Sequence, residues 1–238
     1  MKNLYYVYDD FGNVYLSFKE FIECHDFLGT GSTYCFALVG LSNVNFNFDL
    51  DNKIYTLKRN EFDGRFDFDF IVKRTHKSNG VLYLHAEIMN GMYEVGALSV
   101  LNGNHEGNDR VWMDMAMHLK KIYISASYIY SGVKGNIDKD AVIIEGRYII
   151  DYYSFYCEVG YSFFGKYGYM GNNINAFEDC LIELESEHKK INVIWKDSDT
   201  SFAAINNTLP RELYQSSSYD MIAIINEHCN LTLELNNH

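Results

Sequence analysis

The sequence predicts an α+β protein, with a mostly antiparallel β domain at residues 1–135 and an α/β domain built on a three-stranded parallel sheet at 138–238. Short runs of alternating polar and apolar residues fill the first part, and strands alternate with helical patterns in the second. Between them, residues 131–136 (SGVKGN) have the composition of a linker. Hydrophobic residues make up 47% of the chain and aromatic residues 16%, which excludes a mainly disordered protein.

The first part is expected to begin with a helix over residues 17–29. Ser17-Phe18-Lys19-Glu20 has the form of a capping box, and Gly29 is a suitable stop. Seven runs rich in Tyr, Phe, Val and Ile then follow, separated by turn-forming residues, at 33–40, 45–50, 53–59, 65–72, 81–88, 93–100 and 120–130. Their alternation predicts antiparallel strands joined by turns.

The second part contains two kinds of element. Apolar runs at 140–146, 190–195 and 230–235 are expected to be strands, and segments 150–165, 173–187, 198–207 and 218–228 are expected to be helices. Parallel neighbours need a crossover connection, so strands separated by helices indicate a small parallel sheet.

The charge balance favours a basic partner. The chain has 32 acidic and 20 basic residues, a net charge of −12 and a pI near 5.0. Phosphates would be repelled, so direct binding to nucleic acid is not expected, whereas a basic protein or a cationic ligand is a good electrostatic match. Acidity that serves only solubility is the simpler alternative.

The chain is expected to be cytoplasmic. Its start, MKNLYYVYDDFG, lacks the apolar core of a secretory signal, and no run approaches the ~18 apolar residues of a transmembrane helix. The five cysteines form no CxxC pair and are expected to be reduced and mostly buried, with Cys180 and Cys229 in the core.

The helix expected at 173–187 is strongly amphipathic. Ile174, Phe177, Cys180, Leu181 and Leu184 share one side, and Asn175, Glu178, Asp179, Ile182 and Glu183 share the other. Residues 178–187 include five carboxylates and no Lys or Arg. Tyr167, Tyr169 and three glycines precede the helix. Aromatic residues beside charges are typical of protein interfaces, although a solvated helix face would have the same charges.

Motifs for other chemistry are missing from the sequence. The eight histidines form no HxxxH or HExxH pattern, and no nucleotide-binding or nucleophile motif occurs, so neither a metal nor a cofactor is expected. Two pairs of alternating acids, Asp49 with Asp51 and Asp67 with Asp69, leave open a hydrolase that uses a carboxylate dyad. A wet sheet face is the alternative for these pairs.

Residues 169–181 read Tyr169-Met170-Gly171-Asn172-Asn173-Ile174-Asn175-Ala176-Phe177-Glu178-Asp179-Cys180-Leu181. This segment resembles the signature of the barstar family, which are bacterial inhibitors of ribonucleases. In that signature a Tyr/Gly-rich loop leads into Gly-x-Asn-Leu-Asp-Ala-Leu-x-Asp-Cys-Leu. The ending, Glu227-His228-Cys229-Asn230-Leu231-Thr232-Leu233, is similar to the closing strand of that family. The order of strands and helices over 138–238 also agrees with the family.

The resemblance implies a cytoplasmic immunity protein, not an enzyme, that blocks the active site of a basic ribonuclease toxin. Tyr169 would be the loop aromatic, Asp179 the central carboxylate and Glu227 a peripheral acid, with Gly171 in the loop. Asn175 and Ile182 depart from the family pattern, and Glu178 and Glu183 are expected to restore part of the negative charge. Residues 1–135 would be an accessory domain, and a regulatory interaction module with the same fold is the alternative function.

Overall fold

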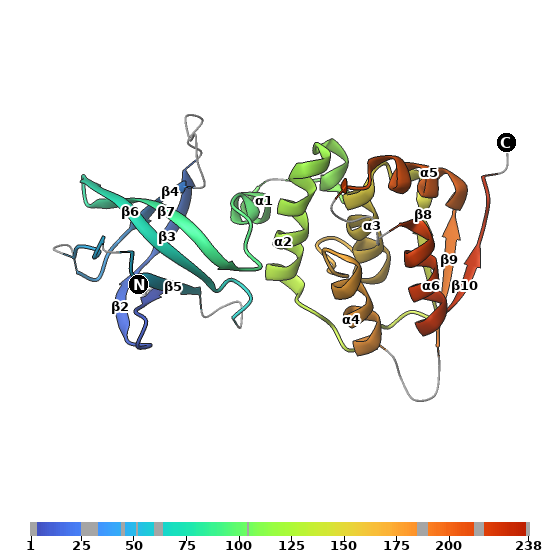
Figure 1. Cartoon of the computed structure of the whole chain (residues 1–238), viewed down its shortest axis with the longest axis horizontal. Helices are drawn as coiled ribbons and strands as arrows, with labels where there is room; N and C mark the ends of the chain where they lie inside the picture. The colour runs from blue at the N-terminus through green and yellow to red at the C-terminus, as the bar shows by residue number, and fades with distance from the viewer. Residues whose placement is uncertain are drawn as a thin grey trace. The chain divides into compact units, whose positions relative to one another are not determined.

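The fold is described from a computed structural model that covers residues 4–24, 33–43, 46–50, 52–59, 64–103, 105–184, 190–211 and 217–236. The chain forms two compact units, residues 1–99 and 100–238 (Figure 1). The predicted boundary lay at 135–138, so the segment from 100 to 135 belongs with the second unit and not with the β-rich part. The α+β class is confirmed.

Within the described residues, the first unit is an antiparallel sheet of seven strands in the order β2-β1-β5-β6-β7-β4-β3. The strands are β1 (Tyr5–Tyr8), β2 (Val14–Phe18), β3 (Glu20–Cys24), β4 (Thr33–Val39), β5 (Ile54–Arg59), β6 (Phe68–Ser78) and β7 (Val81–Gly91). β2 and β3 stand at opposite ends of this order, yet only Lys19 separates them in the chain. The sheet therefore curves until its two ends meet at Lys19.

Aromatic side chains fill the inside of this curved sheet. Phe21, Phe66 and Phe68 are buried there with Tyr93, whose ring stacks on Phe68 at 4.5 Å. The cavity among Val7, Phe21, Phe36, Leu38, Leu57, Phe68, Phe70 and Leu84 has a volume of only about 10 Å³, too small for a ligand. The interior is thus a packed core and not a binding cavity.

The helix predicted at residues 17–29 is wrong in its first half. Residues 14–18 form β2 and residues 20–24 form β3. Phe18 of β2 and Phe21 and Glu23 of β3 point to the inside of the sheet. The local capping signal is overridden because β3 pairs with β4 along its whole length. Residues 25–29 lie outside the described residues.

Three further segments differ from the predicted strands. Residues 120–130 belong to helix α2 (Lys120–Ser131), residues 97–102 form helix α1 (Ala97–Asn102), and residues 46–50 have no regular structure. α2 buries Lys120, Tyr123, Ile124 and Ser127, which is the i, i+3, i+4, i+7 spacing of a helix. Two short 3₁₀ helices, η2 (Val111–Asp114) and η3 (Met117–Leu119), precede α2.

The second unit has the predicted parallel sheet, in the order β10-β9-β8. Its elements after α2 are β8 (Ala141–Glu145), η4 (Gly146–Tyr148), α3 (Tyr152–Phe164), α4 (Ile174–Leu184), β9 (Ile191–Lys196), α5 (Ser198–Thr208), α6 (Ser218–His228) and β10 (Cys229–Leu233). Every strand and helix expected over 138–238 is therefore present. Figure 1 shows α3, α4 and α6 on one side of this sheet, where Val193 and Trp195 are buried.

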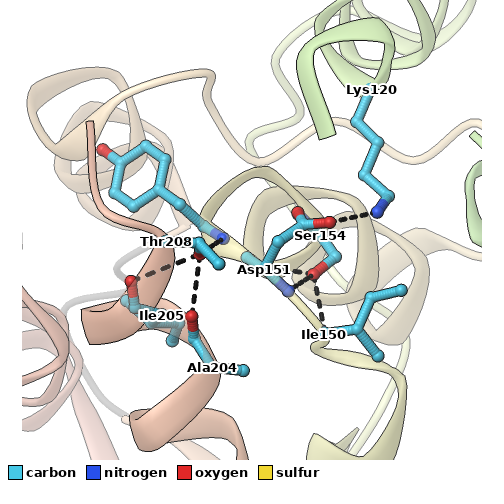
Figure 2. Close-up of polar contacts among 8 residues, drawn as sticks. Lys120, Ile150, Asp151, Ser154, Ala204, Ile205 and Thr208 are labelled. Carbon is cyan, nitrogen blue, oxygen red and sulfur yellow. Dashed lines mark hydrogen bonds and ion pairs between the residues drawn. The ribbon is translucent and has the colours of Figure 1, made fainter. Parts of the chain in front are cut away.

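The start of α3 is fixed by a buried polar cluster (Figure 2). Asp151 caps the helix by accepting from the Ser154 N–H at 2.8 Å, and its carboxylate also accepts from the Lys120 ammonium. Thr208 of α5 accepts from the Tyr152 N–H at 2.8 Å. α2, α3 and α5 are thereby joined at one point.

The middle of α3 is held by a second buried charge. The guanidinium of Arg110 donates two hydrogen bonds to the carboxylate of Glu158, at 2.8 and 3.0 Å, and lies between the rings of Tyr148 and Tyr161. Burial raises the pKa of Glu158, while Arg110 opposes that shift. α3 is thus a fixed support for the elements that pack on it.

Candidate partner-binding site

Helix α4 presents the predicted acidic side to solvent. Asn173 starts the helix, because its side-chain oxygen accepts from the Ala176 N–H at 3.0 Å. Phe177, Cys180, Leu181 and Leu184 are buried, as the helical pattern predicted. On the opposite side, Asn175, Asp179, Ile182 and Glu183 are exposed and Glu178 is half-exposed.

The end of α6 lies beside this side of α4. The imidazole Nε2 of His228 is 3.9 Å from a carboxylate oxygen of Glu178, and Glu227 is exposed next to it. Possible ligand atoms of Glu178, Glu227 and His228 all lie within 4.8 Å of one another. Glu227 therefore joins the same surface as α4, although about fifty residues separate it from Glu178 in the chain.

We call this surface the acidic face. It comprises Asn175, Glu178, Asp179, Ile182 and Glu183 of α4 and Glu227 of α6, and the largely buried side chain of His228 lies next to Glu178. Within the described ranges, no Lys or Arg forms an ion pair with any of its four carboxylates. Ile182, 49% exposed, is the apolar residue among these charges. The face can thus attract a cation and bury one apolar contact.

Tyr169 is not part of the acidic face. Its side chain is only 3% exposed, and its ring packs edge-on against Tyr128 of α2 at 5.0 Å. Burial raises the pKa of its hydroxyl, with Cys180 and Tyr128 as neighbours. The prediction that Tyr169 is a surface anchor is therefore wrong in this structure: the residue holds the loop onto α2 and α4.

Gly171 is also an internal packing residue. It is buried with a φ of +87°, and a Cβ at this position would lie 2.5 Å from the backbone nitrogen of Phe177. Gly168 likewise faces Gly160 of α3, whose carbonyl would be 2.1 Å from an added Cβ. The sequence predicted that these glycines permit a close approach. The approach is to α3 and α4, and its effect is to fix where α4 begins.

Sequence reasoning missed two residues. His228 had no metal or catalytic motif, and only its position next to Glu227 could have pointed to it. Tyr130 is 60% exposed and its ring lies 5.5 Å from that of Tyr167, so it is an exposed aromatic beside the loop. It was overlooked because residues 120–130 were expected to form a strand.

The acidic face offers two kinds of chemistry. Its carboxylates can accept charge-assisted hydrogen bonds from Arg, Lys or His⁺ of a protein, as a phosphate group does. Glu178, Glu227 and His228 are, among the described residues, the one group whose spacing would also suit a metal ion. No metal was expected from the sequence, and carboxylates at a surface commonly lie this close together without one.

The aspartate pairs of the first unit are less suited to catalysis. Asp67 pairs with Lys58 at 2.9 Å, and Asp69 accepts from the Thr56 hydroxyl at 2.7 Å. Both alternate with inward phenylalanines, so they lie on the outer surface of the sheet. Asp49 is exposed, and Asp51 falls outside the described residues. This is the arrangement expected of a wet sheet face.

The acidic face is an exposed anionic patch on a layer of helices, and not a cleft. None of the helices in the described ranges has the length and apolarity needed to cross a membrane. Comparisons with family models, curated proteins and solved structures found no match for this chain.

Proposed function

We propose that the chain is a non-enzymatic immunity protein, which acts in the cytoplasm by binding and blocking the active site of a cognate basic ribonuclease toxin. The observation that carries the proposal is the acidic face. It gathers Glu178, Asp179, Glu183 and Glu227 from two helices around one exposed isoleucine. The resemblance of residues 169–181 to the barstar signature supplies the class of partner.

The proposed mechanism is phosphate mimicry. A ribonuclease binds the RNA backbone with Arg, Lys and His⁺ side chains, and carboxylates on a rigid helix can occupy those positions. Asp179 is the central residue, because it is exposed in the middle of the face, with Glu178 and Glu183 on either side along α4. Long-range attraction between an anionic face and a cationic active site would speed association.

The decisive experiment is a titration of the toxin domain encoded beside this chain, with cleavage of an RNA substrate as the readout. Stoichiometric inhibition is expected, and Asp179→Ala should weaken binding by about 2–5 kcal/mol because toxin cations lose their buried partner. Glu20→Gln, which neutralises an exposed carboxylate on β3, is the matched control and should bind normally. Equal affinity for Asp179→Ala and the unmodified protein would disprove the site.

A regulatory interaction module with the same fold is the second candidate. The burial of Tyr169 favours it, because the loop aromatic expected to contact a ribonuclease is turned inward. Asn175 and Ile182 also alter the chemistry of the face. Absence of inhibition with retained binding to another basic protein would favour this alternative.

A further inference from the structure

Two cysteines of the first unit lie directly opposite each other on neighbouring strands. In the antiparallel pairing of β3 with β4, the partner of Cys24 is Cys35. Both alternate with inward side chains, Glu23 on β3 and Phe36 on β4, so both thiols are on the outer surface of the sheet. Both residues are partly exposed, whereas Cys157, Cys180 and Cys229 are buried.

This position meets the Cα-distance criterion for a disulfide. Cα atoms of residues directly opposite in an antiparallel pair are about 4.5–5.5 Å apart. Disulfides connect Cα atoms about 4.4–6.8 Å apart. The Cα spacing of Cys24 and Cys35 is therefore compatible with a disulfide between them. All five cysteines of the chain are thiols in the structure.

Two polar residues continue the same row of the sheet beyond the cysteines. His85 of β7 is the partner of Cys35 on its other side, and Arg74 of β6 is the partner of His85. All of these side chains point to the outer surface, where His85 is partly exposed and Arg74 is exposed.

We propose that Cys24 and Cys35 are an oxidisable dithiol, which closes the β3–β4 pair with a disulfide when the protein meets a small disulfide oxidant such as oxidised glutathione. One protein thiolate attacks the glutathione disulfide and releases one reduced glutathione. The second protein thiolate then attacks the mixed disulfide and releases another. Two protein thiols are oxidised, one glutathione disulfide is reduced to two thiols, and the protons pass to the glutathione thiolates.

The bond would secure the strand that holds the start of α1. Glu23, next to Cys24, accepts hydrogen bonds from the N–H groups of Gly96 and Ser99, at 2.9 Å each, and from the hydroxyl of Tyr93. A covalent link from β3 to β4 limits the separation of these strands in the unfolded chain. Oxidation is thus expected to raise the unfolding midpoint of the first unit.

The test uses the full reduced chain treated with oxidised glutathione, followed by alkylation under denaturing conditions and mass spectrometry. The expected product is a monomer that has lost two hydrogens, carries no glutathione, and has three alkylated cysteines where the untreated chain has five. A peptide that joins Cys24 to Cys35 should appear after digestion. Stable glutathione adducts on both residues, or a disulfide-linked dimer, would overturn the proposal.

Two variants make the test specific. Cys24→Ser removes the second thiol, so Cys35 should retain glutathione as a stable adduct. In the double variant Cys24→Ser with Ile22→Cys, the thiol moves two residues along the same face, to the position opposite Ala37. It then stands diagonal to Cys35, at about 7–8 Å, and the cross-link should be lost. Equal cross-linking in this variant would show that the register of the two cysteines is irrelevant.

Discussion

Glu178 of α4 and His228 of α6 lie 3.9 Å apart, from a carboxylate oxygen to the imidazole Nε2. This contact joins the two helices that build the acidic face, and it places the carboxylates of Glu178 and Glu227 next to each other. A guanidinium or ammonium group that approaches one of them can therefore be shared by both.

The first prediction is energetic coupling between Glu178 and Glu227 in toxin binding. If both contact one cation, Glu178→Gln and Glu227→Gln should each weaken binding, and the double variant should differ from the sum by about 0.5–3 kcal/mol. Calorimetric titration of the four proteins measures this cycle. Glu20→Gln combined with Glu227→Gln should be additive within about 0.5 kcal/mol. Additivity in the first cycle as well would exclude a shared cation.

The second prediction concerns the buried ion pair between Lys120 and Asp151. Lys120→Met should lower the free energy of unfolding by about 3–5 kcal/mol, because Asp151 is left buried without its cation. Lys196→Met is the matched control: Lys196 pairs with Glu145 at 3.4 Å while 39% exposed, and such pairs contribute about 0–1 kcal/mol. Urea unfolding of both variants gives the comparison, and similar losses would mean that Lys120 is not a buried partner.

The third prediction separates two effects of replacing Gly171: backbone strain at its positive φ, and a steric clash of the added Cβ. Gly165 has a φ of +79° and open space around its Cβ position, so Gly165→Ala should cost only backbone strain of about 1–3 kcal/mol. Gly171→Ala adds a clash with Phe177, which should cost a further ~1–3 kcal/mol. Thermal unfolding ranks the two variants, and a smaller loss for Gly171→Ala would contradict the close approach of loop and helix.

Much of the second unit could be predicted from the sequence. α4 combines a clear 3.6-residue apolar period with charges on one side only, and the apolar runs of β8 and β9 are bounded by helical patterns. α2 could not be predicted in this way. Its Tyr and Ile residues favour strands by propensity, and their helical spacing matters only because Lys120 and Tyr123 find buried partners.

The helical period of the apolar residues in α4 predicted which of its carboxylates are exposed. The rest of the site depends on contacts between residues that are distant in the sequence. Glu227 meets Glu178 because α6 packs on α4. The side chain of Tyr169 is buried because its ring packs against Tyr128 of α2. The sequence predicted a strand in place of α2, so this contact could not be foreseen. A Tyr/Gly-rich loop has the same composition whether its ring meets a partner or the protein's own core, so the pattern alone could not decide.

The fourth prediction is a loss of stability at alkaline pH. Burial raises the pKa of the Cys180 thiol from 9.0 to about 12, and Asp179 and Glu183 add to the shift. Below pH 9 the thiol is protonated in both states; between 9 and 12 only the unfolded chain ionises, which favours unfolding. The slope from this one group approaches ~1.4 kcal/mol per pH unit.

Cys180→Ala should make the pH profile shallower in this window, whatever its effect on stability at pH 8. The raised pKa values of buried tyrosines such as Tyr123 act in the same direction only above their ordinary value of 10.0. Burial also raises the pKa of the Cys157 thiol. The contribution of Cys180 is therefore the difference between the profiles of Cys180→Ala and the unmodified protein, measured as unfolding free energies in urea between pH 8 and 10. Parallel profiles for the variant and the unmodified protein would contradict the shift.

The last prediction is that Glu183 affects the rate of association with the toxin and not the rate of dissociation. Glu183 is exposed at the edge of the acidic face, whereas Asp179 lies in its middle. Charge at the edge of an interface acts mainly through long-range attraction, so Glu183→Lys should slow association with the toxin and leave dissociation nearly unchanged. The difference should shrink as salt rises, because a Debye length of about 10 Å at 0.1 M falls to about 3 Å at 1 M. Stopped-flow measurements at both salt concentrations distinguish the two rates. A large rise in the dissociation rate would instead place Glu183 inside the buried contact, together with Asp179.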